Sequence, residues 1–233
     1  MSGHKSIYRV LSQAILKINC PPLTGRVIDL ASGGHSDYRY FLNLSKEAQY
    51  ITSDIKKEEG VDIVLDLTQK LPFEDGSFDV VLLFNCLYIF ENPEKVLKEI
   101  KRIVKPNGFL LALTPFVFNE IPEPADYWRF TGQGLAKILR QAGFKEIKII
   151  PFGERFSAAV SLLNKFLIFN FLKPFIYWLA VQLDKTVPKN IKKNHPCPLG
   201  YLTIARKLSQ PFYHHQPNNG ADDFRGHSGQ DNS

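Results

Sequence analysis

The sequence predicts an α/β fold, with a doubly wound and mostly parallel sheet covered by helices on both faces. Short apolar runs typical of buried strands alternate with segments whose apolar residues recur at helical spacing. The first apolar run, residues 27–30, leads into a turn of small residues, 31–34, where the backbone can bend sharply and approach a ligand. A second run, 50–54, follows at the spacing of one strand–helix–strand unit.

Two carboxylates mark the ends of these first two strands. Asp29 lies near the end of the first strand and Asp54 ends the second. In a parallel sheet the carboxyl ends of neighbouring strands meet at one edge, where ligands bind. A carboxylate at the end of the second strand is suited to binding both hydroxyls of a ribose. The pattern therefore predicts a crevice for a nucleoside-containing ligand.

Length and composition indicate one globular domain with an insertion, because 44% of the 233 residues are hydrophobic. The three cysteines, Cys20, Cys86 and Cys197, are odd in number and widely spaced, which favours a reduced cytoplasm over a disulfide framework. The amino terminus lacks the continuous apolar core of a signal peptide, so we expect a cytoplasmic protein. No His or Cys spacing suggests a metal site, and none is predicted.

The net charge of +6 comes from one late segment. Residues 1–154 carry 19 Lys/Arg and 19 Asp/Glu, whereas residues 155–207 carry 9 Lys/Arg and a single acid, Asp184. These basic residues stand among large apolar side chains and no nucleic-acid-binding motif accompanies them. A nucleic-acid partner is therefore not predicted.

The remaining elements follow in order. Helical spacing predicts a helix over residues 5–19, stopped by two prolines, and a second helix over 38–44 after the small-residue turn. Apolar runs predict strands at 61–65, 78–85, 109–114, 144–150 and 199–207. Asn92 and Thr131 are expected to cap two further helices. Nearly fifty residues separate the last two strands.

Four segments, 27–35, 66–73, 77–83 and 102–110, resemble class I S-adenosylmethionine-dependent methyltransferases of type 11 in order and approximate spacing. The resemblance spans roughly residues 26–150. It implies a Rossmann-like, seven-stranded, mostly parallel sheet of order 3-2-1-4-5-7-6, with S-adenosylmethionine as cofactor. Together with the composition of the remaining residues, it divides the chain into a core at 1–154 with its cofactor half at 26–114, a helical insertion at 155–198, a last strand at 199–208 and a disordered tail at 209–233.

The resemblance also implies the cofactor-binding residues. Asp66 would accept a hydrogen bond from the adenine amino group and Leu67 would offer its backbone N–H to the ring. Alternatively, Asp66 caps a local turn. Ala31 and His35 stand where the family has glycines, and Ala31 requires a negative φ or some strain. The expected set is Asp29, Ala31, Ser32, Gly33, Asp54, Ile55, Asp66, Leu67 and Asn85.

The connection at 115–131 is rich in proline and aromatic residues and follows a strand, a position where loops carry function. It resembles the Asp-Tyr-Trp-Arg-Phe-Thr segment of a bacterial subgroup associated with glycan or surface-polymer synthesis, which suggests a hydroxyl-bearing acceptor. Asp126 would act as a base or substrate holder, and Tyr127 and Arg129 would orient the substrate. Alternatively, Asp126 and Arg129 pair with each other and fix the loop.

The insertion is dense in aromatic and aliphatic residues from 156 to 183, but Lys165 interrupts its best apolar window, so a membrane-spanning helix is not expected. Two interpretations remain open. Its aromatic residues and lysines suit two helices lying on the inner face of an anionic membrane. The same residues suit a helical subdomain that covers the substrate cleft or packs against a second copy in a homodimer.

The leading hypothesis is a methyltransferase that acts at oxygen on a small-molecule, glycan or lipid-linked acceptor. A nicotinamide-dependent oxidoreductase is disfavoured, because the Gly-x-Gly-x-x-Gly loop is missing and Asp29 would repel a pyrophosphate. A catalytically inactive, methyltransferase-like scaffold stays open because of Ala31 and His35. Cys86 is not expected to be a nucleophile, since the sequence supplies no paired base.

Overall fold

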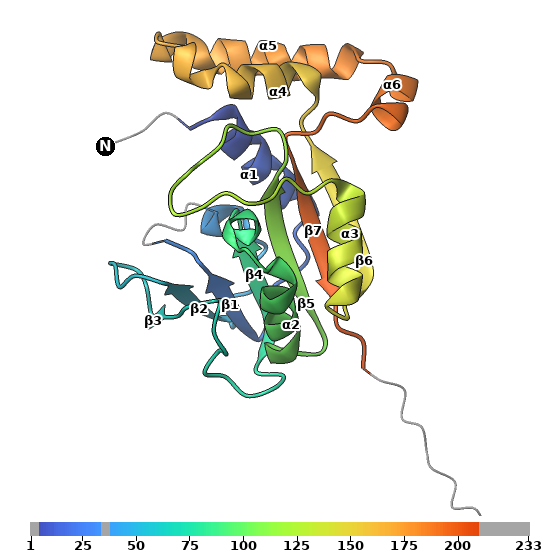
Figure 1. Cartoon of the computed structure of the whole chain (residues 1–233). Helices are drawn as coiled ribbons and strands as arrows, with labels where there is room; N and C mark the ends of the chain where they lie inside the picture. The colour runs from blue at the N-terminus through green and yellow to red at the C-terminus, as the bar shows by residue number, and fades with distance from the viewer. Residues whose placement is uncertain (1–4, 34–37, 210–233) are drawn as a thin grey trace, which may run out of the picture.

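The computed structural model describes residues 5–33 and 38–209, and its centre is a seven-stranded sheet of order β3-β2-β1-β4-β5-β7-β6 (Figure 1). Strands β1 to β5 run parallel, and β7 runs antiparallel between β5 and β6. The predicted fold class and strand order are confirmed. The strands are β1 (Arg26–Leu30), β2 (Gln49–Asp54), β3 (Ile63–Val64), β4 (Phe78–Phe84), β5 (Val104–Pro115), β6 (Lys145–Phe152) and β7 (Gly200–Arg206).

Strands β1, β4 and β5 form the buried centre of the sheet, with Ile28 opposite Val81 and Val81 opposite Leu110. Their apolar runs are nearly continuous because both faces of the sheet are covered. Successive residues point to opposite faces, so Val27 packs in one core cluster and Ile28 in the other. The parallel strands thus bring their carboxyl ends to one edge, where the predicted site residues lie.

Each face of the sheet has its own helices (Figure 1). Helices α2 (Pro93–Ile103) and α3 (Gly132–Gln141) cover one face, and α1 (Ile7–Asn19) covers the other. The predicted caps are present. Asn92 accepts a hydrogen bond from the Lys95 N–H at 3.1 Å, and Thr131 accepts one from the Gly134 N–H at 3.1 Å.

The helix predicted over residues 38–44 is wrong. Only one turn of 3₁₀-helix, η1 (Arg39–Phe41), forms there. The following residues are held in extended form instead, because the Leu23 N–H donates to the Asn43 carbonyl and Leu44 forms a bridge with Leu23. Pairing with a distant segment therefore outweighs the local helical pattern.

Two strand predictions also differ in extent. The strand expected at 61–65 shrinks to Ile63–Val64, and β5 begins at Val104 rather than at residue 109. The pairing of β4 with β5 shifts between Phe78 and Val80, opposite the Asn107 and Gly108 turn. Asn107 has a φ of 64°, a left-handed conformation that asparagine tolerates better than most residues. Residues 107 and 108 therefore form an irregularity inside β5 rather than lying before the strand.

The insertion forms a helical layer beyond α1, at the end of the molecule that carries the 115–131 loop (Figure 1). Its two longer helices, α4 and α5, lie side by side. Within residues 5–33 and 38–209, no helix is long and apolar enough to cross a bilayer. The helical segments are α4 (Arg155–Leu162), η3 (Asn164–Phe166), η4 (Asn170–Leu172), α5 (Lys173–Thr186) and α6 (Lys189–Asn194).

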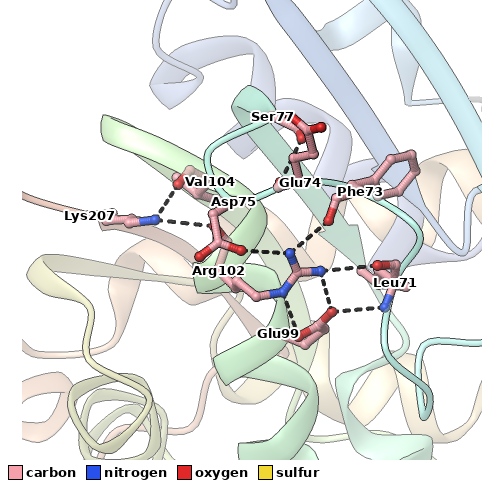
Figure 2. A network of polar contacts seen from close by, with 9 residues as sticks. All are labelled: Leu71, Phe73, Glu74, Asp75, Ser77, Glu99, Arg102, Val104 and Lys207. Carbon is pink, nitrogen blue, oxygen red and sulfur yellow. Dashed lines mark hydrogen bonds and ion pairs between the residues drawn. The ribbon is translucent and has the colours of Figure 1, made fainter.

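A polar network centred on Arg102 fixes the connection between β3 and β4 (Figure 2). The guanidinium donates to the carbonyls of Leu71 and Phe73 at 3.0 and 2.7 Å and to the carboxylates of Asp75 and Glu99. Glu99 also accepts the Leu71 N–H at 2.8 Å. One side chain of α2 thereby orders a loop that begins at the predicted adenine-binding residues.

Candidate functional site

The turn after β1 has the open geometry of a ligand loop. Ala31 and Gly33 both have positive φ, 54° and 62°, so Ala31 carries the strain that the sequence had left as one of two options. Among the described residues, a Cβ added at Gly33 would meet no atom within 4 Å, so these residues leave space beside the backbone. The Ser32 N–H donates to the Ser53 carbonyl at 2.9 Å and ties this loop to β2. His35 lies outside the described residues.

Asp54 and Asp29 occupy different environments at these strand ends. One Asp54 oxygen accepts the Gly33 N–H at 2.9 Å, and the other accepts the Ile55 N–H at 2.8 Å. Asp29 is buried, and its carboxylate accepts a hydrogen bond from the Tyr50 hydroxyl at 2.6 Å. Asp54 is thus held at the loop, whereas Asp29 lies inside the sheet.

Asp66 caps a local turn, which is the second of the two roles that the sequence suggested for it. Its carboxylate accepts hydrogen bonds from the Thr68 N–H at 2.9 Å and the Thr68 hydroxyl at 2.7 Å, and these bonds lower the pKa of Asp66. The side chain is nevertheless exposed, next to the buried Leu67. The turn and a contact with a ligand are compatible, since a carboxylate has four lone-pair sites.

Cys86 lies close to two of the three predicted carboxylates. Burial is the main cause that raises the pKa of its thiol, and the charges of Asp29 and Asp54 raise it further. A buried, protonated thiol is a poor nucleophile, in agreement with the sequence.

These features fit S-adenosylmethionine at the ends of β1 to β3. Gly33 leaves room for close backbone approach, and Asp54 presents a carboxylate of the type that binds ribose hydroxyls. Ile55, the next residue, is 63% exposed and offers an apolar surface for a ring. Acidic groups near this region favour a ligand with a cationic sulfonium and ammonium.

A polar cavity of about 280 Å³ lies beside the end of β4. The Tyr8 hydroxyl donates to Asn85 Oδ1 at 2.6 Å, and Asn85 Nδ2 donates to the Tyr38 hydroxyl at 2.9 Å. Asn85, one of the expected cofactor-binding residues, lines this cavity. The lining residues are Lys5, Ser6, Tyr8, Arg9, Tyr38, Asn85, Tyr88, Pro115, Phe118 and Ile121.

Tyr8 and Tyr38 are functional candidates that the sequence did not single out. Tyr8 is fully enclosed, and burial, followed by the neighbouring Tyr38 and Tyr88, raises the pKa of its phenol well above the usual value. The phenol therefore keeps its proton at neutral pH and acts as a hydrogen-bond donor. The only sequence signal was a polar tip on the apolar face of the first helix.

An ion pair between Asp126 and Arg129 fixes the 115–131 loop, as the second of the two interpretations of these residues expected. Arg129 forms a two-pronged salt bridge to Asp126, with Nη2 2.6 Å from Oδ2. This pairing lowers the pKa of Asp126, whose side chain is only 4% exposed and also accepts the Ile121 N–H at 3.0 Å. Arg129 in turn lies over the Tyr88 ring, 5.7 Å from its centroid. The pair thus supports two residues of the cavity wall.

Tyr127 is more than half exposed, and its backbone N–H donates to the Tyr88 carbonyl at 2.9 Å. The Trp128 indole N–H donates to the Phe90 carbonyl at 2.9 Å. Both contacts attach the loop to the segment that follows β4. Among the residues described, no three His, Cys, Asp or Glu side chains gather in a way that could hold a metal ion.

Comparison with known proteins agrees with this geometry. Residues 24–112 match the family model described as a methyltransferase domain. Over these residues the chain is similar to a methyltransferase domain, and the strand order of its sheet is that of the Rossmann-like methyltransferase fold. This type of domain uses S-adenosylmethionine, and the matched residues include the turn after β1 and the ends of β2, β3 and β4.

Two curated relatives show how much of the chain this methyltransferase domain accounts for. An uncharacterised protein of Methanocaldococcus jannaschii is 24% identical over 147 residues, which cover 57% of this chain and 70% of that protein. Phthiotriol/phenolphthiotriol dimycocerosates methyltransferase 1 of Mycobacterium ulcerans is 29% identical over 109 residues, 42% of this chain and 40% of that protein. The chain therefore spans less than half of the second relative.

A solved structure shares the fold. Phosphoethanolamine N-methyltransferase 2 of Haemonchus contortus, in complex with S-adenosyl-L-methionine, superposes with a TM-score of 0.54 at 21% identity. The superposition covers 84% of this chain and 52% of that chain. The antiparallel β7 and the family match together decide against the oxidoreductase alternative, whose dinucleotide fold has a parallel sheet of order 3-2-1-4-5-6.

Proposed function

We propose that the chain transfers a methyl group from S-adenosylmethionine to an oxygen of a small-molecule, glycan or lipid-linked acceptor. The observation that carries the proposal is the position of Asn85. It directly follows β4, the strand that pairs with β1, and its amide lines the cavity. A donor at the strand ends and an acceptor in the cavity would therefore meet at this residue.

The cofactor-binding roles follow from the contacts at the strand ends. Asp54 would accept the ribose hydroxyls, and Ile55 would lie against the adenine, covering its exposed apolar surface. Asp66 and Leu67 would contact the adenine edge. Asp29, Ala31, Ser32 and Gly33 would surround the amino-acid end. The bound cofactor supplies an activated methyl group, so the protein chiefly has to align the acceptor with it.

The cavity wall offers hydrogen-bonding groups that suit a hydroxyl acceptor. Asn85, Tyr8 and Tyr38 are joined there by two hydrogen bonds. A hydroxyl both donates and accepts, so it would find partners among these three side chains. This is the support for oxygen as the acceptor atom.

For the loop we propose divided roles. Asp126 and Arg129 would position the wall of the cavity rather than exchange protons, because each already satisfies the other. Tyr127, which is exposed on the same loop, would orient the acceptor as it enters. No proton transfer is assigned to Asp126, since its lowered pKa makes it a weak base.

Calorimetry with S-adenosylmethionine and S-adenosylhomocysteine tests the proposal directly. The chain should bind both, and Asp54→Ala and Asp66→Ala should each weaken binding by about 1–3 kcal/mol, because each removes hydrogen bonds at a partly buried site. Glu146→Ala is the matched control. Glu146 is an exposed carboxylate on β6, far from the strand ends, and its loss should leave affinity unchanged.

The inactive-scaffold alternative predicts the opposite result. A folded chain that binds neither compound would overturn the proposed function and favour the scaffold. If binding is seen, labelled methyl groups offered with a panel of sugar and lipid-linked acceptors should identify the acceptor. A panel of amines serves as the comparison and should accept no label.

A further inference from the structure

The insertion presents a large apolar surface to solvent. Phe166, Ile168 and Phe171 are 77%, 75% and 76% exposed, and they lie in the turn that joins α4 to α5. Isolated apolar residues are common on protein surfaces, but a concentration of this kind marks an interaction site. We call this surface the apolar face, and it consists of Phe166, Ile168, Phe169, Phe171, Phe175 and Trp178.

The helices α4 and α5 form a hairpin that packs against the core and leaves the apolar face exposed. Tyr177 and Ala180 of α5 are buried, so this helix packs against the core through one side while Phe175 and Trp178 remain exposed. The Tyr177 hydroxyl donates to Asn164 Oδ1 at 2.5 Å across the hairpin. Packing thus occupies one side of the hairpin, and the aromatic side chains of the apolar face, which contact one another, remain exposed to solvent.

The acidic residue of the hairpin, Asp184, accepts hydrogen bonds within the hairpin. Asp184, near the end of α5, is buried and accepts the Phe156 N–H at 2.9 Å at the start of α4. It is the only acid in residues 155–198, against seven basic residues, which gives this segment a net charge of +6. The basic residues are Arg155, Lys165, Lys173, Lys185, Lys189, Lys192 and Lys193.

We propose that the apolar face docks on the interfacial region of an anionic membrane. Aromatic and aliphatic side chains would enter the boundary between headgroups and acyl chains, and the lysines would contact anionic headgroups while their stems cover apolar surface. In this arrangement the helices of the insertion would lie parallel to the bilayer surface. The inference concerns the insertion alone and goes beyond the proposed methyl transfer.

Charge argues against a second copy of the chain as the occupant. A two-fold symmetric dimer through the apolar face would place the same surface on both subunits. It would bring two segments of charge +6 together, and residues 155–198 hold no second acid to compensate. An anionic bilayer satisfies both the apolar and the cationic character of the surface.

The arrangement would also bring the acceptor cavity close to the bilayer. The helical layer and the 115–131 loop lie at the same end of the molecule (Figure 1). Lys5 of the cavity wall also lines an apolar groove between α1 and α5, which has Trp178 on its other side. Docking through the apolar face would therefore bring the methyltransferase site to the membrane surface.

Co-sedimentation of the full chain with vesicles tests the proposal. The chain should sediment with vesicles of phosphatidylglycerol and phosphatidylcholine at low salt and much less with phosphatidylcholine alone. Phe166→Ser/Phe171→Ser should weaken binding at least about tenfold, because it removes two exposed rings from the apolar face. Lys165→Gln/Lys173→Gln should weaken binding to the anionic vesicles on the order of tenfold, with little effect on phosphatidylcholine.

Tyr40→Ser is the matched control, because Tyr40 is 92% exposed but lies outside the insertion. Circular dichroism and binding of S-adenosylmethionine should show that every variant is folded. Lack of sedimentation with anionic vesicles would overturn the proposal, as would equal binding by Phe166→Ser/Phe171→Ser and the parent chain. A dimer in sedimentation velocity that the same variant dissociates would assign the apolar face to a second copy. Cofactor calorimetry measures the proposed function separately.

Discussion

At the scale of single residues, the pairing of Asp126 with Arg129 favours a structural role over a catalytic role for the charged residues of the segment 126–131. An Asp-Tyr-Trp-Arg motif in a loop after a strand resembles a catalytic signature, and the carboxylate is its natural base. In the structure that carboxylate is nearly enclosed and receives three hydrogen bonds from Arg129 and Ile121. Buried ion pairs of this quality fix a geometry, and removing one partner leaves the other uncompensated.

Loss of either partner should therefore loosen the loop. Asp126→Asn and Arg129→Gln should each lower the free energy of unfolding by about 1–3 kcal/mol, because each leaves a partly buried charge without its partner. Both should speed proteolysis within residues 115–131 and leave cofactor affinity unchanged. Denaturant unfolding and limited proteolysis measure the two effects.

Glu120→Gln is the control, since Glu120 is exposed on the same loop. It should behave like the parent chain. Unchanged stability in both variants, together with loss of transfer in Asp126→Asn alone, would return Asp126 to the role of catalytic base.

At the scale of elements, the sequence predicted correctly those features that depend on interactions between neighbouring residues, such as helix caps. The Asn92 cap with Pro93 in the first turn gave the start of α2 correctly, because capping involves only neighbouring residues. The predicted helix at 38–44 failed because Leu44 pairs with Leu23, and no pattern within the segment reports that partner.

The site shows the same division. Carboxylates at strand ends could be placed from their position after apolar runs, and Asp54 lies at the loop as expected. The hydrogen bond between Tyr8 and Asn85 joins residues 77 positions apart, so helical spacing within residues 5–19 could not indicate it. The pairing of Asp126 with Arg129, only three residues apart, was foreseen as one of two options.

Asp184 provides a prediction about a single element. Its carboxylate accepts N–H groups of Phe156 and Ser157, which lie at the first turn of α4 and have no partner within that helix. Asp184→Ala should therefore destabilise the chain by about 1–2 kcal/mol and speed hydrogen exchange in the first turn of α4. Exchange elsewhere in the sheet should change only as much as global stability requires.

Lys185→Ala is the adjacent control. Lys185 is exposed and donates only to Gln182, so its loss should alter stability by less than about 0.5 kcal/mol. Equal protection of α4 in the parent and in Asp184→Ala would show that the cap contributes nothing to the hairpin.

At the scale of the whole molecule, the two ends of the sheet differ: one end carries the candidate site, and the other carries a network of polar contacts. The carboxyl ends of the parallel strands carry the site and the helical layer, whereas the Arg102 network ties the other end together (Figure 2). Besides the contacts of Arg102, Lys207 donates to the Val104 carbonyl at 2.6 Å and attaches the segment after β7.

The network makes global stability depend on pH in a defined direction. Arg102 is the main cause that lowers the pKa of Glu99, so this carboxylate is more acidic in the folded chain than its unfolded value of about 4.3. A group whose folded pKa is depressed contributes stability above its unfolded pKa and loses it as pH falls through the folded pKa. Stability should thus be highest near neutrality and fall as pH drops below about 5.

Glu99→Gln tests this assignment, since glutamine keeps the shape of the side chain but does not titrate. The variant should be less stable at pH 7, because Arg102 loses one of its two carboxylate partners and keeps only Asp75, and its stability should fall less steeply between about pH 5 and pH 3. Some slope should remain, because hydrogen bonds also lower the pKa of Asp62 and Asp66. Denaturant unfolding at several pH values gives both curves, and parallel curves would show that Glu99 does not couple folding to protonation.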